Sequence, residues 1–352
     1  MQGRRIVKLL LILAGAFLLP AESVHSLLPE PGRFKMSDGL LLHWNGNANG
    51  RGRDAIEAFD RHGVRVFGID IYKLLPSAKR ISIDDIAVRR NQSIAIAAVS
   101  REKNDQTRAW LLQLGWDARL GRMTDLDAAK SIGWLDFDES GNVWGLTDYL
   151  GEKVRRDTIY NGVRCPLGPL ILVFNPEGKI VKSLLNQVDF PDSLQEAPAI
   201  GQVAFGLTND RVWFWQPARH RMIVTDREGG HARKISIPHA RTWNLGGQTI
   251  LTPAGEVVQD LHSPTPGVRG IYLARGDGIE RFSQPQDVFL AGMDGSEFVF
   301  LRQTNSTGDF RMIRVTSLAG LQNLTKLEPS PQGAAARVVT PPTDSTPEPA
   351  HF

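Results

Sequence analysis

The residues that could support metal-assisted chemistry in this chain are mostly carboxylates in short loops. The densest group lies in "WLDFDESGN", where Asp136, Asp138 and Glu139 stand close together. Carboxylate oxygens are the ligands that calcium and magnesium prefer, so this group could hold a divalent cation. The letters from Asp138 to Asn142 are also typical of a tight turn, because Asp, Ser, Gly and Asn favour turn backbone conformations. The turn is the simpler interpretation.

Zinc and nucleophilic chemistry have no recognisable pattern in the sequence. His220, His231, His239 and His262 lack the spacing of zinc ligands. The chain contains no Gly-x-Ser-x-Gly motif and no phosphate-binding glycine loop. The single cysteine, Cys165, has no flanking histidine to activate it. The catalytic residues, if there are any, therefore stay unknown, and we predict no cofactor, apart from a divalent metal if the protein is an enzyme.

The elements that must position any site are paired β-hairpins. In "RHRMIVTDREGGHARKISIP", residues 219–238, two alternating apolar runs flank turn residues from Asp226 to Gly230. Each of six such hairpins is preceded by another hairpin, which makes six units of four antiparallel strands. Similar hairpins begin at Ala55, Ala109, Leu170, Gly270 and Arg311. A four-stranded unit that recurs about every 40–60 residues predicts an all-β fold, a six-bladed β-propeller.

The expected blades fill most of the chain. We place them at about 33–75, 84–125, 133–188, 202–238, 248–283 and 287–325. The first blade holds four strands of its own, so we expect the ring to close without a strand from the other terminus. "VWFW" at 212–215 is apolar at every position, which indicates a strand covered on both faces by neighbouring blades.

Two of the blades resemble a known family in their letters. "VWFWQPARHRMIVTDREGGHARKI" at 212–235 resembles the NHL repeat, and "VWGLTDY" with "LILVFNPEGKIV" in the third blade is similar. The family's aspartate at the end of the second strand stands here as Asp148, whereas Gln216 occupies the equivalent place in the fourth blade. The resemblance implies a divergent NHL-like, six-bladed propeller. Such propellers serve as binding scaffolds and as enzymes, including lactonase-like hydrolases with a metal at the channel mouth.

Alignment of the six units places arginines and tryptophans on one face of the ring. An arginine stands near the start of the third strand of each unit, where it either belongs to the repeat or contacts an anionic ligand. Flat aromatic side chains beside guanidinium groups suit acidic sugars or a peptide. The candidate ligand-binding residues are Arg53, Arg108, Arg164, Arg221, Arg269, Arg311, Trp44, Trp110, Trp134 and Trp243. The long insertion at 149–168 is a candidate lid over this face.

The two ends of the chain differ from the repeats. Arg4, Arg5 and Lys8 precede an uncharged run from Leu9 to Leu19, which predicts a signal peptide at 1–26 with cleavage after Ser23 or Ser26. An uncleaved N-terminal anchor is the alternative. Residues 327–352 hold six of the 21 prolines and predict a disordered tail. The folded domain is expected at 27–326.

These features predict a secreted or periplasmic protein. Cys165 lies far from the leader, so we do not expect a lipoprotein. Without residues 1–23 the chain has 38 basic and 37 acidic residues, which argues against nucleic acid as a partner. We predict a monomeric, non-catalytic binding or scaffolding module for a protein, a peptide or an acidic glycan. A metal-dependent hydrolase or lyase with its site in the central channel is the alternative.

Overall fold

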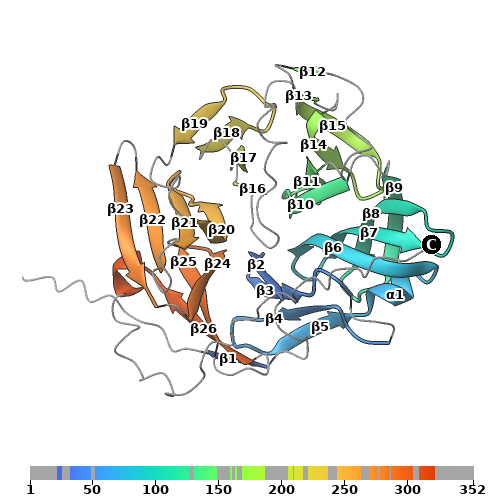
Figure 1. Ribbon diagram of the computed structural model, residues 1–352, viewed down its shortest axis with the longest axis horizontal. Coiled ribbons are helices and arrows are strands. Elements are labelled where there is room, and N and C mark those ends of the chain that lie inside the picture. The colour runs from blue at the N-terminus through green and yellow to red at the C-terminus, as the bar shows by residue number, and fades with distance from the viewer. Residues whose placement is uncertain are drawn as a thin grey trace, which may run out of the picture.

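The computed structural model places six β-sheets in a ring around a central axis, with β2, β6, β10, β16, β20 and β24 as the innermost strands (Figure 1). Each of these sheets has four antiparallel strands, so the six-bladed β-propeller prediction is confirmed. The structure describes residues 22–25, 32–48, 52–126, 131–148, 159–160, 163–164, 169–186, 205–208, 210–216, 221–236, 244–262, 269–275, 278–285, 287–303 and 309–321.

The first three blades follow the chain from the N-terminal side. Blade 1 contains β2 (Arg33–Ser37), β3 (Leu40–Trp44), β4 (Ile56–Phe59) and β5 (Arg65–Ile69). A short helix, α1 (Ile71–Leu74), leads into blade 2. Blade 2 contains β6 (Ala78–Arg89), β7 (Ser93–Glu102), β8 (Thr107–Gly115) and β9 (Leu120–Leu126). Blade 3 contains β10 (Ser131–Phe137), β11 (Val143–Asp148), β14 (Pro169–Phe174) and β15 (Ile180–Asn186).

The remaining blades complete the ring. Blade 4 contains β16 (Phe205–Leu207), β17 (Arg211–Gln216), β18 (Arg221–Asp226) and β19 (Arg233–Ser236). Blade 5 contains β20 (Asn244–Leu251), β21 (Val257–His262), β22 (Arg269–Arg275) and β23 (Gly278–Gln284). Blade 6 contains β24 (Val288–Asp294), β25 (Glu297–Gln303), β26 (Asp309–Val315) and, outermost, β1 (Glu22–His25).

The core lies between the blades. Along β17, Val212 and Phe214 pack into the cluster shared with blade 3, whereas Trp213 and Trp215 pack into the cluster shared with blade 5. Successive side chains of a strand point to opposite faces, and in a propeller both faces of a blade are covered. This explains why "VWFW" contains no polar residue.

Buried carboxylates tie several blades together near the axis. Each accepts a hydrogen bond from a backbone N–H in the innermost strand of the next blade. The donors and acceptors are Leu135 N to Asp85 Oδ2 at 2.7 Å, Leu207 N to Asp136 Oδ2 at 2.8 Å, and Leu290 N to Asp260 Oδ2 at 3.0 Å. A buried N–H needs a partner, and a carboxylate acceptor makes the bond charge-assisted. These bonds therefore stabilise the junctions of blades 2 with 3, 3 with 4, and 5 with 6.

The ring closes differently from our expectation. Blade 1 does hold four strands of its own, but the predicted final hairpin from Arg311 is wrong, because Leu318–Gly320 forms a 3-10 helix after β26. The outermost strand of blade 6 comes from the other end of the chain. Glu22–His25 pairs antiparallel with Asp309–Met312. The ring is thus closed by an N-terminal strand.

Candidate ligand-binding site

Five of the six predicted arginines share one face in the topology of the ring. Arg108, Arg221, Arg269 and Arg311 lie at or near the start of the third strand of their blades, and Arg53 precedes the third strand of blade 1. The second strand of each blade ends on this face, which also carries the connections from one blade to the next. We call it the arginine face. Arg164 lies instead in a separate two-stranded hairpin of β12 (Ile159–Tyr160) and β13 (Val163–Arg164) within the blade 3 insertion.

The arginine side chains have different surroundings. Arg53 and Arg108 are exposed, whereas Arg221 and Arg311 are partly buried. The side chains of Arg164 and Arg269 lie outside the described part of the structure. Arg108 is the arginine of this set that lines a described cavity. Among the described side chains of this set, Arg108 therefore borders a cavity, and the ring of six guanidinium groups stays a prediction.

The predicted tryptophans separate into core and cavity residues. Trp44 is buried in the cluster between blades 1 and 2, and Trp134 packs partly buried against two clusters around blade 4. Trp110 also belongs to the core, but it lines the same cavity as Arg108. Trp243 lies outside the described residues, as do the 327–352 tail and all of the 149–168 insertion except the two short strands.

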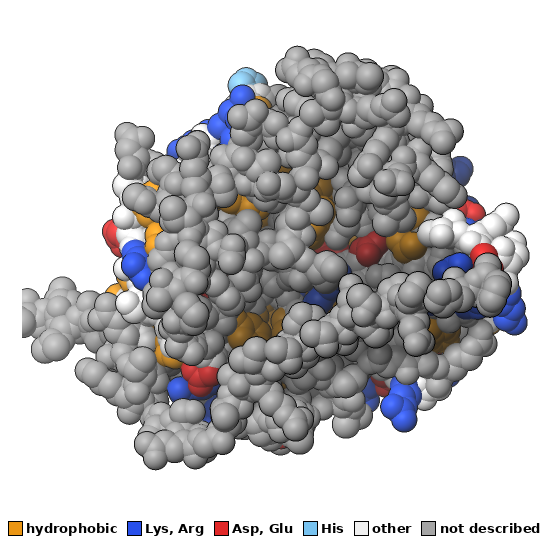
Figure 2. Space-filling model, viewed as in Figure 1, with side chains coloured by type: hydrophobic (Ala, Val, Ile, Leu, Met, Phe, Trp, Pro, Cys, Tyr) orange, Lys and Arg blue, Asp and Glu red, His pale blue; other side chains and the backbone are white. Residues whose placement is uncertain are grey.

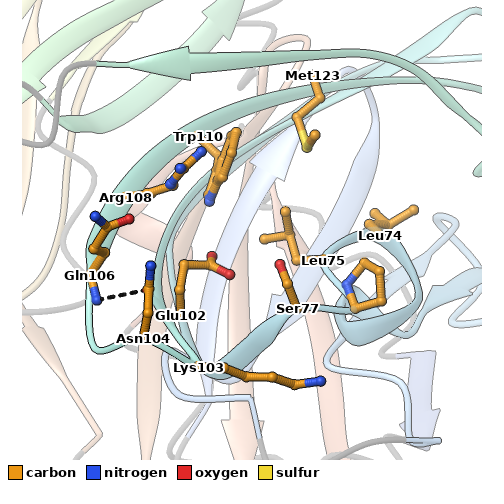
Figure 3. Close-up of a pocket in the computed structure, with 11 residues that line it drawn as sticks. Leu74, Leu75, Ser77, Glu102, Lys103, Asn104, Gln106, Arg108, Trp110 and Met123 are labelled. Carbon is orange, nitrogen blue, oxygen red and sulfur yellow. Dashed lines mark hydrogen bonds between the residues drawn. The ribbon is translucent and has the colours of Figure 1, made fainter.

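The cavity lies on the arginine face between blade 2 and the α1 segment that leads into it, and it has a volume of about 620 Å³. One wall comes from α1 and the segment that follows it, and the other wall comes from β7, β8 and β9 of blade 2 (Figure 3). Its lining residues are Leu74, Leu75, Pro76, Ser77, Glu102, Lys103, Asn104, Gln106, Arg108, Trp110 and Met123. Apolar and charged groups thus face the same space.

Strand pairing explains why the blade 2 residues converge. Ala98 is paired with Trp110, and Ser100 is paired with Arg108, so these residues and Glu102 share one face of the sheet. The guanidinium carbon of Arg108 lies 5.7 Å from the centre of the Trp110 ring, and Arg108 Nη1 donates to Asp125 Oδ2 at 3.1 Å. The indole ring and the ion pair together orient the guanidinium at the cavity wall.

A hydrogen-bonded chain runs beneath the guanidinium. Trp110 Nε1 donates to Ser100 Oγ at 2.8 Å, and Ser100 Oγ donates to Glu102 Oε1 at 2.5 Å. Burial by itself raises the pKa of Glu102, but hydrogen bonds from Ser100 and Ser77 and the charge of Arg108 outweigh it, so the pKa lies below its usual value. Glu102 is therefore ionised at neutral pH, and its carboxylate holds the hydroxyl groups of Ser100 and Ser77 in place at the cavity wall.

The cavity wall combines a cationic hydrogen-bond donor with apolar surface. Arg108 supplies a half-exposed donor for an acidic group, and Trp110, Leu75 and Met123 supply apolar surface for the rest of a ligand. The Glu102 carboxylate is occupied by two serine hydroxyls. Our alignment found Arg108 and Trp110 but missed Ser77, Ser100 and Glu102, because "SREKNDQTR" looks like a loop. β7 in fact continues through Ser100 to Glu102.

The central channel carries the other concentration of charge, and Figure 2 shows acidic, basic and apolar side chains near the middle of the ring. Lys35 Nζ donates to Asp85 Oδ2 at 2.7 Å and to the carbonyl of Leu135 at 2.6 Å, which joins blades 1, 2 and 3. Gln248 Nε2 donates to the carbonyl of Phe34 at 2.6 Å, which joins blades 5 and 1. Side chains therefore cross the channel between blades that are not neighbours.

The acidic cluster of the alternative, enzymatic prediction does not converge. Asp138 accepts bonds from the Asn142 backbone and side chain and from Trp144 Nε1, so it closes a turn. Glu139 forms a bidentate pair with Arg227 at 2.6 and 2.9 Å. Burial raises the pKa of Asp136, whose Oδ2 accepts the Leu207 N–H. Within the residues that the structure describes, no three metal-ligating side chains form a cation site.

Comparison with known proteins supports the fold alone. No protein-family model matches the chain, and no curated protein sequence matches it. A protein from Bacteroides fragilis assigned as exported has a similar structure, with a TM-score of 0.51, 11% identity, and coverage of 85% of this chain and 94% of that chain. Streptogramin B lyase has a TM-score of 0.43 at 11% identity, covering 85% of this chain and 98% of the lyase.

The soluble aldose sugar dehydrogenase from Escherichia coli is a further structural neighbour. Its TM-score is 0.44 at 10% identity, and the match covers 84% of this chain and 99% of the dehydrogenase. Likenesses at such low identity concern the architecture of the ring and assign no site to this chain. Among the described residues, no helix has the length and apolar composition to cross a membrane.

Proposed function

We propose that this protein is an exported, non-catalytic binding module of divergent NHL-like type that takes a small anionic ligand in the cavity between α1 and blade 2. The observation that carries the proposal is the placement of Arg108 over Trp110 at the wall of a cavity of about 620 Å³. A guanidinium group forms directed, charge-assisted hydrogen bonds to carboxylate, sulfate or phosphate oxygens.

The cavity also indicates the rest of the ligand. Leu74, Leu75 and Met123 form apolar surface opposite or beside the indole, which suits the faces of a sugar ring or the aliphatic part of a peptide. Asn104 and Gln106 supply polar groups at the rim. An acidic glycan matches this combination, because it offers ring faces to the apolar wall and an acidic group to Arg108.

Thermal unfolding with a ligand panel tests the proposal. Selective binding to the folded protein raises the melting temperature, and a ligand at 100 times its Kd contributes about 2.7 kcal/mol. We expect acidic glycans to raise the melting temperature and neutral glycans to leave it unchanged. Arg108→Ala should weaken binding about tenfold to a hundredfold, since a hydrogen bond to a charged group contributes about 1.5–3 kcal/mol.

Arg119→Ala is the matched control for this experiment. Arg119 is an exposed arginine of the same blade, but it lies in the turn between β8 and β9, away from the arginine face. Equal stabilisation by neutral glycans, or equal loss in both variants, would refute the proposed site. A shift with calcium or zinc that a chelator reverses would instead favour the metal-dependent enzyme.

A further inference from the structure

A second cavity lies at the junction of blades 2 and 3, which are neighbours in the ring (Figure 1). The hairpins β6–β7, β8–β9, β10–β11 and β14–β15 surround it, and their turns lie on the face opposite the arginine face. Its volume of about 270 Å³ is just below the range of about 300–1,000 Å³ that is usual for ligand sites. The cavity therefore suits a small molecule.

Two arginines of blade 2 extend to the turns of blade 3 at this cavity. Arg89, at the end of β6, donates from Nη2 to the carbonyl of Glu139 in the β10–β11 turn. Arg122 of β9 lies against the β14–β15 turn. A Cβ on Gly141 would lie 2.6 Å from Arg89 Nη1, and a Cβ on Gly178 would lie 2.9 Å from Arg122 Cγ. Both turns thus leave room for an arginine where a larger residue would meet it.

The wall of this cavity has positive charge without a counter-charge. Arg89 and Arg122 both line it, and none of the described lining residues is acidic. Carboxylates of the surrounding turns are bound elsewhere: Asp117 pairs with Arg119, Asp138 accepts bonds within its own turn, and Glu139 pairs with Arg227. Glu177 is exposed and forms an ion pair with neither lining arginine. An anion with two negative charges would neutralise the two guanidinium groups.

Gln113 adds an acceptor that needs a donor. It lines the cavity from β8 and is 9% exposed. Its Nε2 donates to the carbonyl of Asn175 at 3.0 Å, which fixes the orientation of the amide because a flip would bring two oxygens together. Its Oε1 is buried and has no hydrogen-bond partner among the described residues. Since a buried acceptor without a donor is unfavourable, a ligand hydroxyl group would stabilise it.

We propose that this cavity is a second ligand site, which binds a small hydroxy dicarboxylate. The two carboxylates form charge-assisted hydrogen bonds with Arg89 and Arg122, and the hydroxyl group donates to Gln113 Oε1. Leu114 and Phe137 supply apolar surface for the short carbon chain. The site lies on the opposite face of the ring from Arg108, and it takes a smaller ligand than the cavity beside α1.

Calorimetric titration of the folded full-length chain with malate, succinate and sulfate tests the ligand class. Malate carries two carboxylates and a hydroxyl group, succinate lacks the hydroxyl group, and sulfate is a dianion without a carbon chain. We expect malate to bind about twofold to tenfold more tightly than succinate, because one neutral hydrogen bond is lost, and sulfate to bind more weakly than both. No binding of malate, or equal or tighter binding of succinate or sulfate, would overturn the assignment.

Arg122→Ala tests the place of binding. Arg122 is exposed, so the variant should fold, and it should bind malate at least tenfold more weakly. Arg90→Ala is the matched control. Arg90 is also an exposed arginine of blade 2, but its Nη1 lies toward blade 1, 3.8 Å from a Cβ built on Gly39. This control should bind malate like the wild type, and equal weakening in both variants would refute the site.

Arg108→Ala separates this site from the cavity beside α1. The variant should keep wild-type affinity for malate even if it loses the ligand proposed for the other face. Loss of malate binding in Arg108→Ala, with Arg122→Ala unaffected, would assign malate to the cavity beside α1 and overturn the second site.

Discussion

Trp110 illustrates how one side chain can belong to the core and to the candidate site. The ring is 7% exposed and packs with blade 1, its Nε1 donates to Ser100, and its outer face supports Arg108. The same burial that stabilises the propeller therefore fixes the orientation of a binding group. For Trp44, at a comparable place in blade 1, burial in the core is the whole role that the structure shows.

His43 should make the stability of the protein depend on pH. Its imidazole is fully buried beside Phe34 and Glu57, and burial lowers its pKa from 6.5 to about 3. The unfolded chain therefore binds a proton below pH 6.5 that the folded chain does not. Because of this group, the free energy of unfolding should fall by about 1.4 kcal/mol for each unit by which the pH is lowered from 6.5 to 3.

Urea unfolding of wild type and His43→Gln at pH 7, 6 and 5 checks this expectation. The variant should lose the pH dependence that the histidine contributes. The difference in the free energy of unfolding between the two proteins should therefore change with pH. His62→Gln, which alters an exposed histidine of the same blade, should keep the wild-type slope. Parallel curves for wild type and His43→Gln would show that the buried imidazole takes up its proton without unfolding.

Breaking the buried Lys35–Asp85 ion pair should lower the free energy of unfolding far more than breaking a surface ion pair. Both groups are nearly inaccessible, at 6% and 3% of their side-chain area. Lys35→Met leaves a buried carboxylate without its counter-charge, which should cost about 3–5 kcal/mol in denaturant unfolding. Lys79→Met removes the exposed pair with Asp105 and should cost less than about 1 kcal/mol. Similar losses in both variants would mean that Asp85 is satisfied by Leu135 alone.

At the scale of the strand, the innermost element of each blade is shaped by its neighbours as well as by its own sheet. β24 contains a bulge between Leu290 and Gly292, and Gly292 has φ of 146°. A Cβ at this position would lie 2.8 Å from the Cβ of Met36 in blade 1. The glycine thus permits blades 6 and 1 to approach closely at their inner strands.

Gly292→Ala should therefore destabilise the closure of the ring. We expect a loss of about 1–3 kcal/mol in chemical unfolding, since the side chain is both overpacked and strained. Gly121→Ala is the control. Gly121 lies on the outer strand β9, and a Cβ there would lie at an ordinary 3.4 Å from its nearest neighbour, the carbonyl oxygen of Gln113. A neutral Gly292→Ala variant would indicate that the two blades can separate slightly without loss.

Some strands and hairpins could be predicted well from patterns in the sequence. Hairpins such as 219–238 were predictable, because two alternating runs and a polar turn specify pairing between neighbours in sequence. Strand ends were less certain, as at β7, where Ser100 and Glu102 continue the strand with polar residues. Those residues are polar because they bond with Trp110 and with each other, and that contact exists only after β7 and β8 pair.

At the scale of the whole molecule, the closing strand joins the two ends of the propeller. A ring of six blades must be held at one junction by contacts between the first and last blades. Here the apolar cluster of blades 6 and 1 and the pairing of β1 with β26 act together. Closure consequently depends on four residues that lie inside the signal peptide predicted at 1–26 and outside the domain predicted at 27–326.

A chain that begins at Leu27 should be less stable than a chain that begins at Glu22. Deletion of β1 removes the backbone hydrogen bonds of four residue pairs, each worth about 1 kcal/mol, so we expect a loss of a few kcal/mol. Equilibrium unfolding of the two purified chains measures the difference. Identical unfolding curves would show that the cluster of blades 6 and 1 closes the ring without β1.

Local patterns of residues predicted the repeat, the antiparallel blades and the candidates Arg108 and Trp110, because hairpin pairing and strand alternation are local properties. Tertiary structure alone decided which candidates meet. The cavity requires α1 to pack beside blade 2, the channel bonds join non-adjacent blades, and β1 pairs with a strand at the opposite end of the chain. Such contacts depend on how the ring closes, which no local pattern of residues encodes.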